Sequence, residues 1–280
     1  LTYNIRNANW KDALKGRGWK GRREALVAQV QQAAPAVLGL QEAKKRQVRY
    51  LDGALSPYAW YGLGRMNGRH LGEHCPLFYD TTQVQLLAQG TFWLSETPQK
   101  ARKDWDAQFP RTCTWGYFRP RQGQGTAFFV LTTHLDNKGK EARRQSVRLL
   151  ARQARRLQQQ HSPAGPSPLV LMGDFNLTPD HPNYAYLTDS AGFVDVHRKQ
   201  AAYLARAGQA DTLGGTGCSF VPGARNPCKR IDYIFTRHMD LSPAHYPRGY
   251  GYRIRRDTVG SIYPSDHLPV EATLCPRSTW

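Results

Sequence analysis

The sequence is short of acidic residues, cysteine and long apolar runs. None of its apolar runs approaches the roughly 18 residues of a membrane-spanning helix, so we expect no membrane span. Its five cysteines are too few for a disulfide-built scaffold and contain no Cys-x-x-Cys pair of the kind that binds zinc. Repeats and low-complexity segments are also missing. Because layered α/β folds of this length often form one unit, we expect a single domain over residues 1–280 and a monomer.

The shortage of acids makes the chain strongly basic. There are 39 lysines and arginines against 21 aspartates and glutamates, a formal net charge of +18. A field of this sign concentrates polyanions near the surface and speeds their association. Nucleic acid, either DNA or RNA, is therefore the leading candidate partner. The alternative is a charge that serves only solubility or an unusual medium.

Two of the cysteines are spaced for a small disulfide loop. Cys218 and Cys228 bracket a stretch with two prolines and a glycine. Such a bridge forms in an exported protein, whereas a cytosolic enzyme would keep two reduced thiols. We expect the bridge, and with it a secreted or periplasmic location rather than a cytoplasmic one.

Hydrophobic periodicity predicts two helix-then-strand units. Residues 22–34 and 139–160 carry apolar side chains at helical spacing, and the apolar runs 37–40 and 169–172 follow as strands. Strands without helices are predicted between these units, at residues 58–64, 76–79, 84–94, 112–118 and 126–135. Two such halves would bury two sheets face to face with helices outside, which is a four-layer α/β/β/α sandwich with a cleft at one rim.

Short polar clusters end several of the apolar runs: Asn4, Gln41-Glu42, His134-Leu-Asp136, Gly173-Asp-Phe-Asn176, Ile231-Asp-Tyr233 and Ser265-Asp-His267. Carboxylates, carboxamides and imidazoles at strand ends are what a divalent-metal site for cutting phosphate esters requires. Glu42 directly follows a strand and is the predicted metal ligand; alternatively it begins the next helix. Asn4 is a weaker candidate, since asparagine near a strand often caps a turn.

Spacing suggests which of these side chains act together. Asp174 and Asn176 are two residues apart after a strand, so a regular strand would point both to one face, where they could orient a water and a phosphoryl oxygen. The alternative is an Asx-rich turn. His134 and Asp136 share the same spacing, although a lone histidine there is often structural.

Two other acids need different geometry. Asp232 lies in an apolar strand, and a buried acid needs a partner, for which a histidine is the natural choice. Asp266 and His267 are adjacent, so they can face one cleft only from an irregular turn, which Pro264 supplies.

As a set, these motifs resemble the endonuclease/exonuclease/phosphatase superfamily, which includes deoxyribonuclease I. The resemblance spans nearly the whole chain and implies the four-layer sandwich and an attack of water on phosphorus that depends on Mg²⁺ or Mn²⁺, with Ca²⁺ as a further candidate. It also implies residue roles. Glu42, Asn4 and Asp266 hold the metal, Asp174 activates the water, Asn176 and His134 contact the phosphate, and Asp232 orients His267, which acts as base or stabilises the developing charge.

Two further positions resemble deoxyribonuclease I and its nearer relatives. The resemblance implies that Glu73 pairs with His134 and that Arg111 reaches the substrate phosphate. Exposed surface positions are the alternative for both residues.

Three functions are compatible with this net charge and these polar residues. The charge favours a metal-dependent nuclease. A phosphatase or phosphodiesterase acting on a phosphorylated sugar, inositol or lipid headgroup would use the same residues. The third alternative is a protein that binds polyanions without catalysis, and the complete set of polar positions argues against it.

Overall fold

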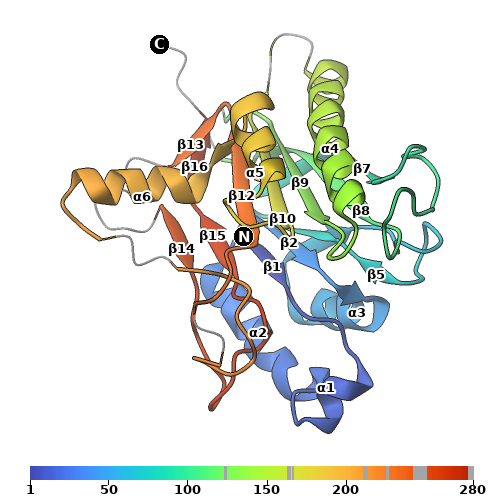
Figure 1. Cartoon of the computed structure of the whole chain (residues 1–280), viewed down its shortest axis with the longest axis vertical. Helices are drawn as coiled ribbons and strands as arrows, with labels where there is room; N and C mark the ends of the chain where they lie inside the picture. The colour runs from blue at the N-terminus through green and yellow to red at the C-terminus, as the bar shows by residue number, and fades with distance from the viewer. Residues whose placement is uncertain are drawn as a thin grey trace.

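The computed structural model describes residues 1–122, 125–162, 165, 167–210, 214–224, 227–241 and 251–276, and it is built on two six-stranded sheets (Figure 1). The first sheet has the strand order β14 (Tyr252–Ile254), β15 (Val270–Ala272), β1 (Thr2–Asn4), β2 (Val37–Gln41), β6 (Leu77–Asp80) and β4 (Tyr58–Tyr61). The second has the order β11 (Val194–Asp195), β12 (Asp232–Arg237), β10 (Leu169–Asp174), β9 (Phe128–His134), β8 (Thr112–Pro120) and β7 (Val84–Trp93).

Two short pairs of strands lie beside these sheets. They are β3 (Ala43–Lys44) with β5 (Glu73–His74), and β13 (Met239–Leu241) with β16 (Leu274–Pro276). β3 directly follows β2, and its pairing with β5 brings Glu73 to the same edge of the molecule as Glu42.

Each sheet contains one parallel pair of strands, and each pair is joined by a helix. The chain passes from β1 to β2 through α1 (Trp10–Leu14) and α2 (Trp19–Ala33), and from β9 to β10 through α4 (Lys140–His161). Parallel neighbours require such a crossover, because the chain must return to the start of the next strand. The two predicted helix-then-strand units are therefore present, although α2 begins at Trp19, before the predicted start.

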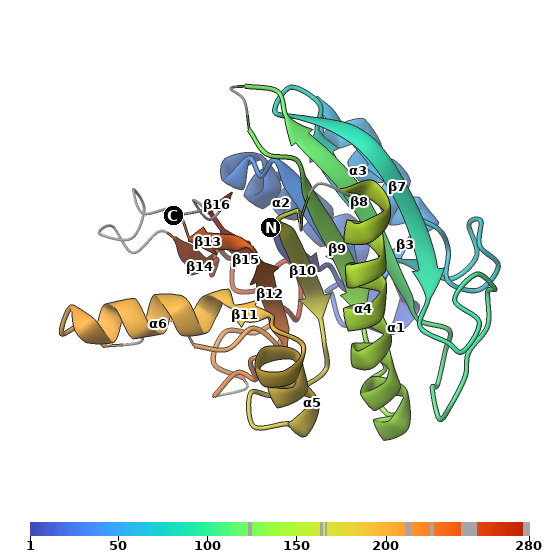
Figure 2. The ribbon, with the colours of Figure 1, turned by 90° about the horizontal axis from the view of Figure 1, so that it is seen from above.

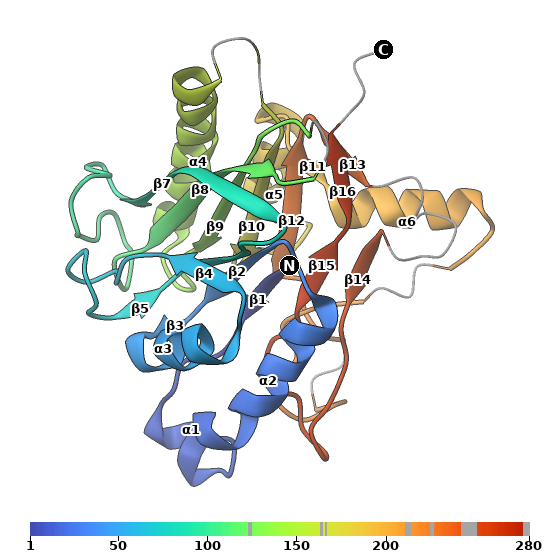
Figure 3. The same ribbon diagram turned by 180° about the vertical axis from the view of Figure 1, so that it is seen from behind.

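Three apolar clusters fill the spaces between the layers. One packs α2 and α3 (Lys45–Ala54) on the first sheet, one packs α4 on the second sheet, and the third lies between the sheets. Figure 2 shows α4 along the second sheet, and Figure 3 shows α2 and α3 in front of the first. Gly39 lets the sheets approach, since a Cβ there would lie 2.6 Å from Thr132 Oγ1. The predicted four-layer α/β/β/α sandwich is confirmed.

The sequence patterns missed several helices. These are α1, α3, α5 (Pro182–Ala185), the single π-turn at Tyr186–Ser190, and α6 (Val196–Arg206). In α3 only Val48 and Leu51 are buried apolar residues, so its apolar stripe is too narrow to stand out in a short basic segment. The chain caps it instead through Gln47, whose side chain accepts a hydrogen bond from the backbone N–H of Lys44. None of the described helices combines the length and apolar character that crossing a membrane requires.

Candidate active site

Strand register brings the polar ends of both sheets to one rim. In the second sheet, Asp174 is directly opposite His134 on one side and Asp232 on the other. In the first sheet, Asn4 is opposite Gln41, the residue before Glu42. The buried Gln41 side chain donates from Nε2 to Thr132 Oγ1 at 3.0 Å, which ties the two sheets together directly beneath this rim.

The backbone turns sharply where these strands end. Arg6, Glu42 and Asn176 all have positive φ angles, of 55°, 61° and 49°. This left-handed conformation is unfavourable for residues other than glycine, at a cost of about 1–3 kcal/mol each. Its concentration at one rim shows that tertiary contacts hold the side chains there against local preference.

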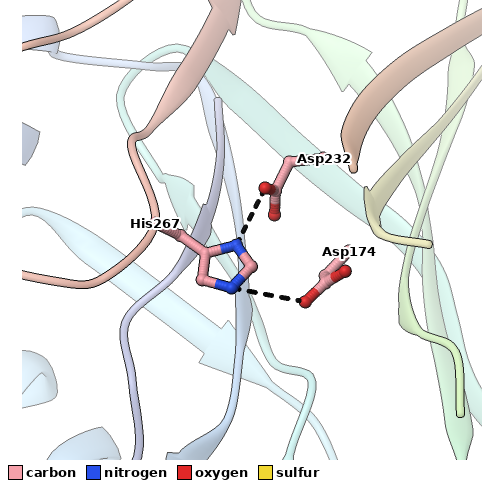
Figure 4. Close-up of side chains that lie close together, drawn as sticks. All are labelled: Asp174, Asp232 and His267. Atoms are coloured by element: carbon pink, nitrogen blue, oxygen red, sulfur yellow. Dashed lines mark hydrogen bonds and ion pairs between the residues drawn. The ribbon is translucent and has the colours of Figure 1, made fainter. Parts of the chain in front are cut away.

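A partly buried histidine, with 13% of its side chain exposed, lies between two carboxylates at the centre of the rim (Figure 4). His267 Nδ1 is 2.8 Å from Asp232 Oδ2, and its Nε2 is 3.8 Å from Asp174 Oδ2. Both aspartates are 2% exposed. The Asp232 backbone N–H donates to Thr216 Oγ1, and the His267 backbone N–H donates to Ser265 Oγ. Asp232 and His267 are therefore each held in place by a hydroxyl group of their own.

The two histidines of the site carry opposite pKa shifts. Burial alone would lower the pKa of His267, but Asp232 and Asp174 raise it well above the usual value, so His267 holds a proton. Burial together with the positive charges of Arg111 and Arg65 lowers the pKa of His134 well below its usual value, so that ring is neutral. Burial raises the pKa of Asp174, and the negative charge of Asp232 raises it further, to about 7.

Glu42 is held as an ionised carboxylate. Its Oε2 accepts hydrogen bonds from the backbone and side-chain N–H groups of Asn7, both at 3.0 Å, and its Oε1 accepts from Asn4 Nδ2 at 3.2 Å. Burial would raise the pKa of Glu42, yet these bonds and the positive charges of His267 and Arg6 leave it lowered. A permanently charged carboxylate is the ligand that a hard divalent cation prefers.

The residues predicted to hold a metal fit such a cation chemically. Glu42 and Asp266 offer carboxylate oxygens suited to Mg²⁺ or Mn²⁺. Asn4 turns its Nδ2 toward Glu42 and its Oδ1 accepts from the backbone N–H of Arg6 at 3.0 Å, so its amide would have to turn over to complete an all-oxygen set. Asp174, Asp232 and His267 also lie close enough to surround an ion, with ligand atoms within 4.8 Å of one another. We favour the first set, because Asp232 already occupies Nδ1 of His267. Asp232 Oδ1, in this second group, is buried without a hydrogen-bond partner among the described residues, and a water would satisfy it.

The arguments from regular two-residue spacing were wrong. Both β9 and β10 end at the first residue of each pair, so the alternation of faces stops there. Asn176 turns back, with its backbone N–H donating to Asp174 Oδ1 and its Nδ2 donating to the carbonyl oxygen of Leu135. Asp136 points to the start of α4, where it accepts from the N–H groups of Lys138 and Gly139.

Glu73 does not pair with His134 as predicted. Because β5 pairs with β3, Glu73 lies on the Glu42 side of the rim, where it accepts from Asn7 Nδ2 at 3.0 Å and forms an ion pair with Arg65 at 2.7 Å. The contacts of the described residues include none between Glu73 and His134.

Arg111 is buried and does not occupy an exposed surface position. It is 6% exposed, and its Nε donates to Asp136 Oδ2 at 3.3 Å. Its positive charge helps to keep His134 neutral. Arg111 Nη1 is buried without a hydrogen-bond partner among the described residues, so the predicted contact with substrate phosphate stays a prediction beside this electrostatic effect.

Three supporting residues were not found from the sequence. The buried Arg22 donates to the carbonyl oxygens of Ile5, Arg6 and Pro264, and it thereby fastens the segment before His267 to the end of β1. Asn7 links Glu42 to Glu73, and Thr216 supports Asp232. Arg22 looks like any arginine on a helix in the sequence, while Asn7 had one weak signal, its proximity to Asn4.

A polar cavity of about 370 Å³ opens beside His267 and Asp266. One wall carries Arg6, Asp12, Lys15 and Arg17, and the other is residues 217–220 with Ala224 and Ile231. The predicted disulfide between Cys218 and Cys228 is present and closes the second wall. A larger apolar cavity of about 740 Å³ lies between the sheets near Val37, at the end of β2 away from Glu42, and far from these polar groups.

Comparison with known proteins agrees with this geometry. Residues 1–267 match the model of the endonuclease/exonuclease/phosphatase family. A protein of this family from Bacteroides thetaiotaomicron is 31% identical over 99% of this chain and 96% of its own, with a TM-score of 0.85. A mannosyl-6-phosphatase from the same organism is 31% identical over 98% of this chain and 97% of its own, with a TM-score of 0.83.

One curated protein matches over a shorter region. Protein angel of Drosophila melanogaster is 29% identical over 181 residues, which are 63% of this chain and 49% of that protein. The chain thus matches about half the length of this relative.

Proposed function

The chain belongs to the endonuclease/exonuclease/phosphatase family, whose members hydrolyse phosphoester bonds and typically require a divalent metal, and from this membership we propose that it is a metal-dependent phosphatase of small phosphorylated carbohydrates. Water attacks phosphorus in this reaction and the sugar hydroxyl leaves. The metal is Mg²⁺ or Mn²⁺, with Ca²⁺ a further candidate.

The observation that carries the choice of substrate is the cavity beside His267. Its volume of about 370 Å³ lies in the range of small-molecule sites, and its walls are polar and charged, as a hydroxyl-rich group requires. The disulfide loop and the segment after α1 bound it on two sides. The likeness to a mannosyl-6-phosphatase over nearly the full length of both chains supports the same class of substrate.

Each site residue has a proposed role in this reaction. Glu42, Asn4 and Asp266 would hold the metal, which when bound supplies a Lewis acid for the oxygens on phosphorus. Asp174, near both histidines, accepts the proton of the attacking water. His134 and Asn176 contact the phosphate. Asp232 holds the His267 imidazolium, which stabilises the negative charge that develops around phosphorus.

Two other residues support these groups from a distance. Glu73 positions Asn7 and thereby Glu42, since Asn7 Nδ2 donates to both carboxylates. Arg111 holds His134 in its neutral form, because its positive charge opposes protonation of that ring.

A nuclease acting on DNA or RNA is the second candidate, and the net charge of +18 favours it. Part of this charge lies on the outer layer, where Arg152, Arg155 and Arg156 of α4 are exposed. Arginines in that layer would attract a polymer without touching the bond that breaks. If the substrate is a polymer, Arg152→Glu with Arg155→Glu should weaken its apparent affinity and flatten the salt dependence, while the maximal rate stays nearly constant.

One panel of substrates separates the two candidates. Phosphate release from hexose 6-phosphates and inositol phosphates is measured beside cleavage of plasmid DNA and single-stranded RNA, each with Mg²⁺, Mn²⁺, Ca²⁺ or excess chelator. We expect the phosphorylated hexoses to have the highest kcat/KM. Faster turnover of either polymer would refute the phosphatase proposal in favour of the nuclease.

The disulfide also bears on location. Such bridges persist in oxidising compartments, so we propose that the enzyme acts outside the cytoplasm. We also propose that it is a monomer. Fractionation of the native cells and light scattering of the pure protein test these two points.

A further inference from the structure

We propose that the cavity beside His267 recognises a second anionic group on the leaving sugar, through Lys15 and Arg17. The substrate class is then a phosphorylated carbohydrate that carries a second phosphate or a carboxylate. This inference rests on the proposed phosphatase function and narrows its substrate. For clarity we call this space, lined by the residues given above, the leaving-group cavity.

Charge within the leaving-group cavity is unevenly balanced. Arg6 is paired with two carboxylates, since its Nε is 2.8 Å from Asp12 Oδ2 and its Nη1 is 3.4 Å from Asp266 Oδ2. Lys15 and Arg17 line the same space, and neither forms an ion pair with a carboxylate of the described residues. Arg6 with Asp12 and Asp266 carries one negative charge in excess, and the charges of Lys15 and Arg17 turn this into one positive charge in excess within the cavity.

The position of Arg17 is fixed by its neighbours. Its backbone N–H donates to the carbonyl oxygen of Asp12 at 2.8 Å, and its guanidinium lies 5.3 Å from the ring centre of Phe220. Phe220 follows the disulfide-bonded Cys218, whose backbone N–H donates to the carbonyl oxygen of Asp266 at 3.0 Å. The contact of Arg17 with Phe220 thus joins the two walls of the cavity, and the second wall is bonded to the catalytic segment, so an anion would meet a site that is already formed.

The position of the leaving-group cavity beside His267 decides which part of the substrate meets the positive charges of Lys15 and Arg17. His267 borders the cavity, so a phosphate bound at the rim places its sugar next to the wall that carries Lys15 and Arg17. An anionic group on that sugar would gain charge-assisted hydrogen bonds with both side chains, whereas a neutral sugar would leave them to water. Discrimination between these sugars is therefore expected to come from binding rather than from the chemical step.

The test compares a hexose 6-phosphate with the matching hexose 1,6-bisphosphate. In the wild type, kcat/KM should be higher for the bisphosphate. In the double variant Lys15→Gln/Arg17→Gln this preference should fall by roughly tenfold, mainly through KM. The single variant Arg17→Lys keeps the charge and should retain part of the preference. A matched control, Lys20→Gln/Arg49→Gln, removes two exposed charges from α2 and α3 and should leave the ratio unchanged.

The outcomes separate this inference from the function on which it rests. If the wild type hydrolyses both sugars without preference, or if the cavity variant lowers kcat/KM equally for both, the second-anion inference is wrong while the phosphatase proposal stands. Turnover of neither sugar would overturn both. Melting temperatures of all variants show whether each is folded. The single variant Lys15→Gln, at an exposed position, is a further control against misfolding as the cause of a loss of preference.

Discussion

The pairing of Asp232 with His267 gives the sharpest test of the site. Asp232→Asn keeps the size and the buried position of the side chain but removes its charge, 2.8 Å from the protonated imidazole. The proton on His267 depends on this carboxylate and on Asp174, because burial alone would remove it. The variant should therefore lose the imidazolium as well as the orientation of the ring.

The size of the effect follows from the burial of the pair. Removing one partner of a buried ion pair costs about 3–5 kcal/mol. At roughly 1.4 kcal/mol per tenfold change in rate, this corresponds to a loss of about 10²–10⁴ in kcat/KM if the pair acts at the transition state. His267→Ala should cause a loss of similar size.

The assay is a double-mutant cycle on phosphate release with saturating Mg²⁺. If the two residues act as a unit, the double variant Asp232→Asn/His267→Ala should be little slower than either single variant. Losses that multiply would refute the pairing as the functional unit.

A matched control comes from another buried ion pair connected to the same sheet. Asp195 is 2% exposed and forms an ion pair with Arg230 at 2.6 Å, and it is not among the residues of the site. Asp195→Asn should lower the melting temperature while kcat of the folded protein is retained. An equal loss of kcat in this control would show that Asp232→Asn acts through stability alone.

Three other variants test the metal ligand, the disulfide and the contact between the sheets. Glu42→Gln should reduce turnover by orders of magnitude without changing the melting temperature much, and excess chelator should abolish turnover of the wild type; full activity in chelator would contradict metal dependence. Cys218→Ser with Cys228→Ser opens a loop of sequence separation 10 and should lower the free energy of unfolding by about 2–3 kcal/mol in a denaturant titration, an effect absent if the bridge is strained or unformed. Gly39→Ala should cost about 1–3 kcal/mol, because the new methyl group meets Thr132 across the sheets, and unchanged stability would show that the sheets can separate freely.

Local pattern was sufficient for the elements that carry the site. The helices α2 and α4 and the strands β2, β9 and β10 were predicted because their apolar residues recur with the period of a helix or form unbroken buried runs. Polar residues at the ends of such runs then identified the rim, and the partnership of Asp232 with a histidine followed from the cost of burying an acid. The family resemblance on those same residues is confirmed, while the single domain over residues 1–280 and the individual catalytic roles stay predictions.

Tertiary structure decided how the side chains meet. Asn4 and Asp174 are 170 residues apart and share a hydrogen bond of 3.0 Å, a contact that no local period encodes. The left-handed turn at Asn176 ends the alternation of faces that the spacing of Asp174 and Asn176 suggested, because tertiary contacts outweigh the local preference for negative φ. The placement of Glu73 beside Arg65 and the excess positive charge of the leaving-group cavity arise in the same way. Periodicity reports which face of an element is buried, but the depth, partners and charge of a polar side chain depend on segments that only the packed sheets bring together.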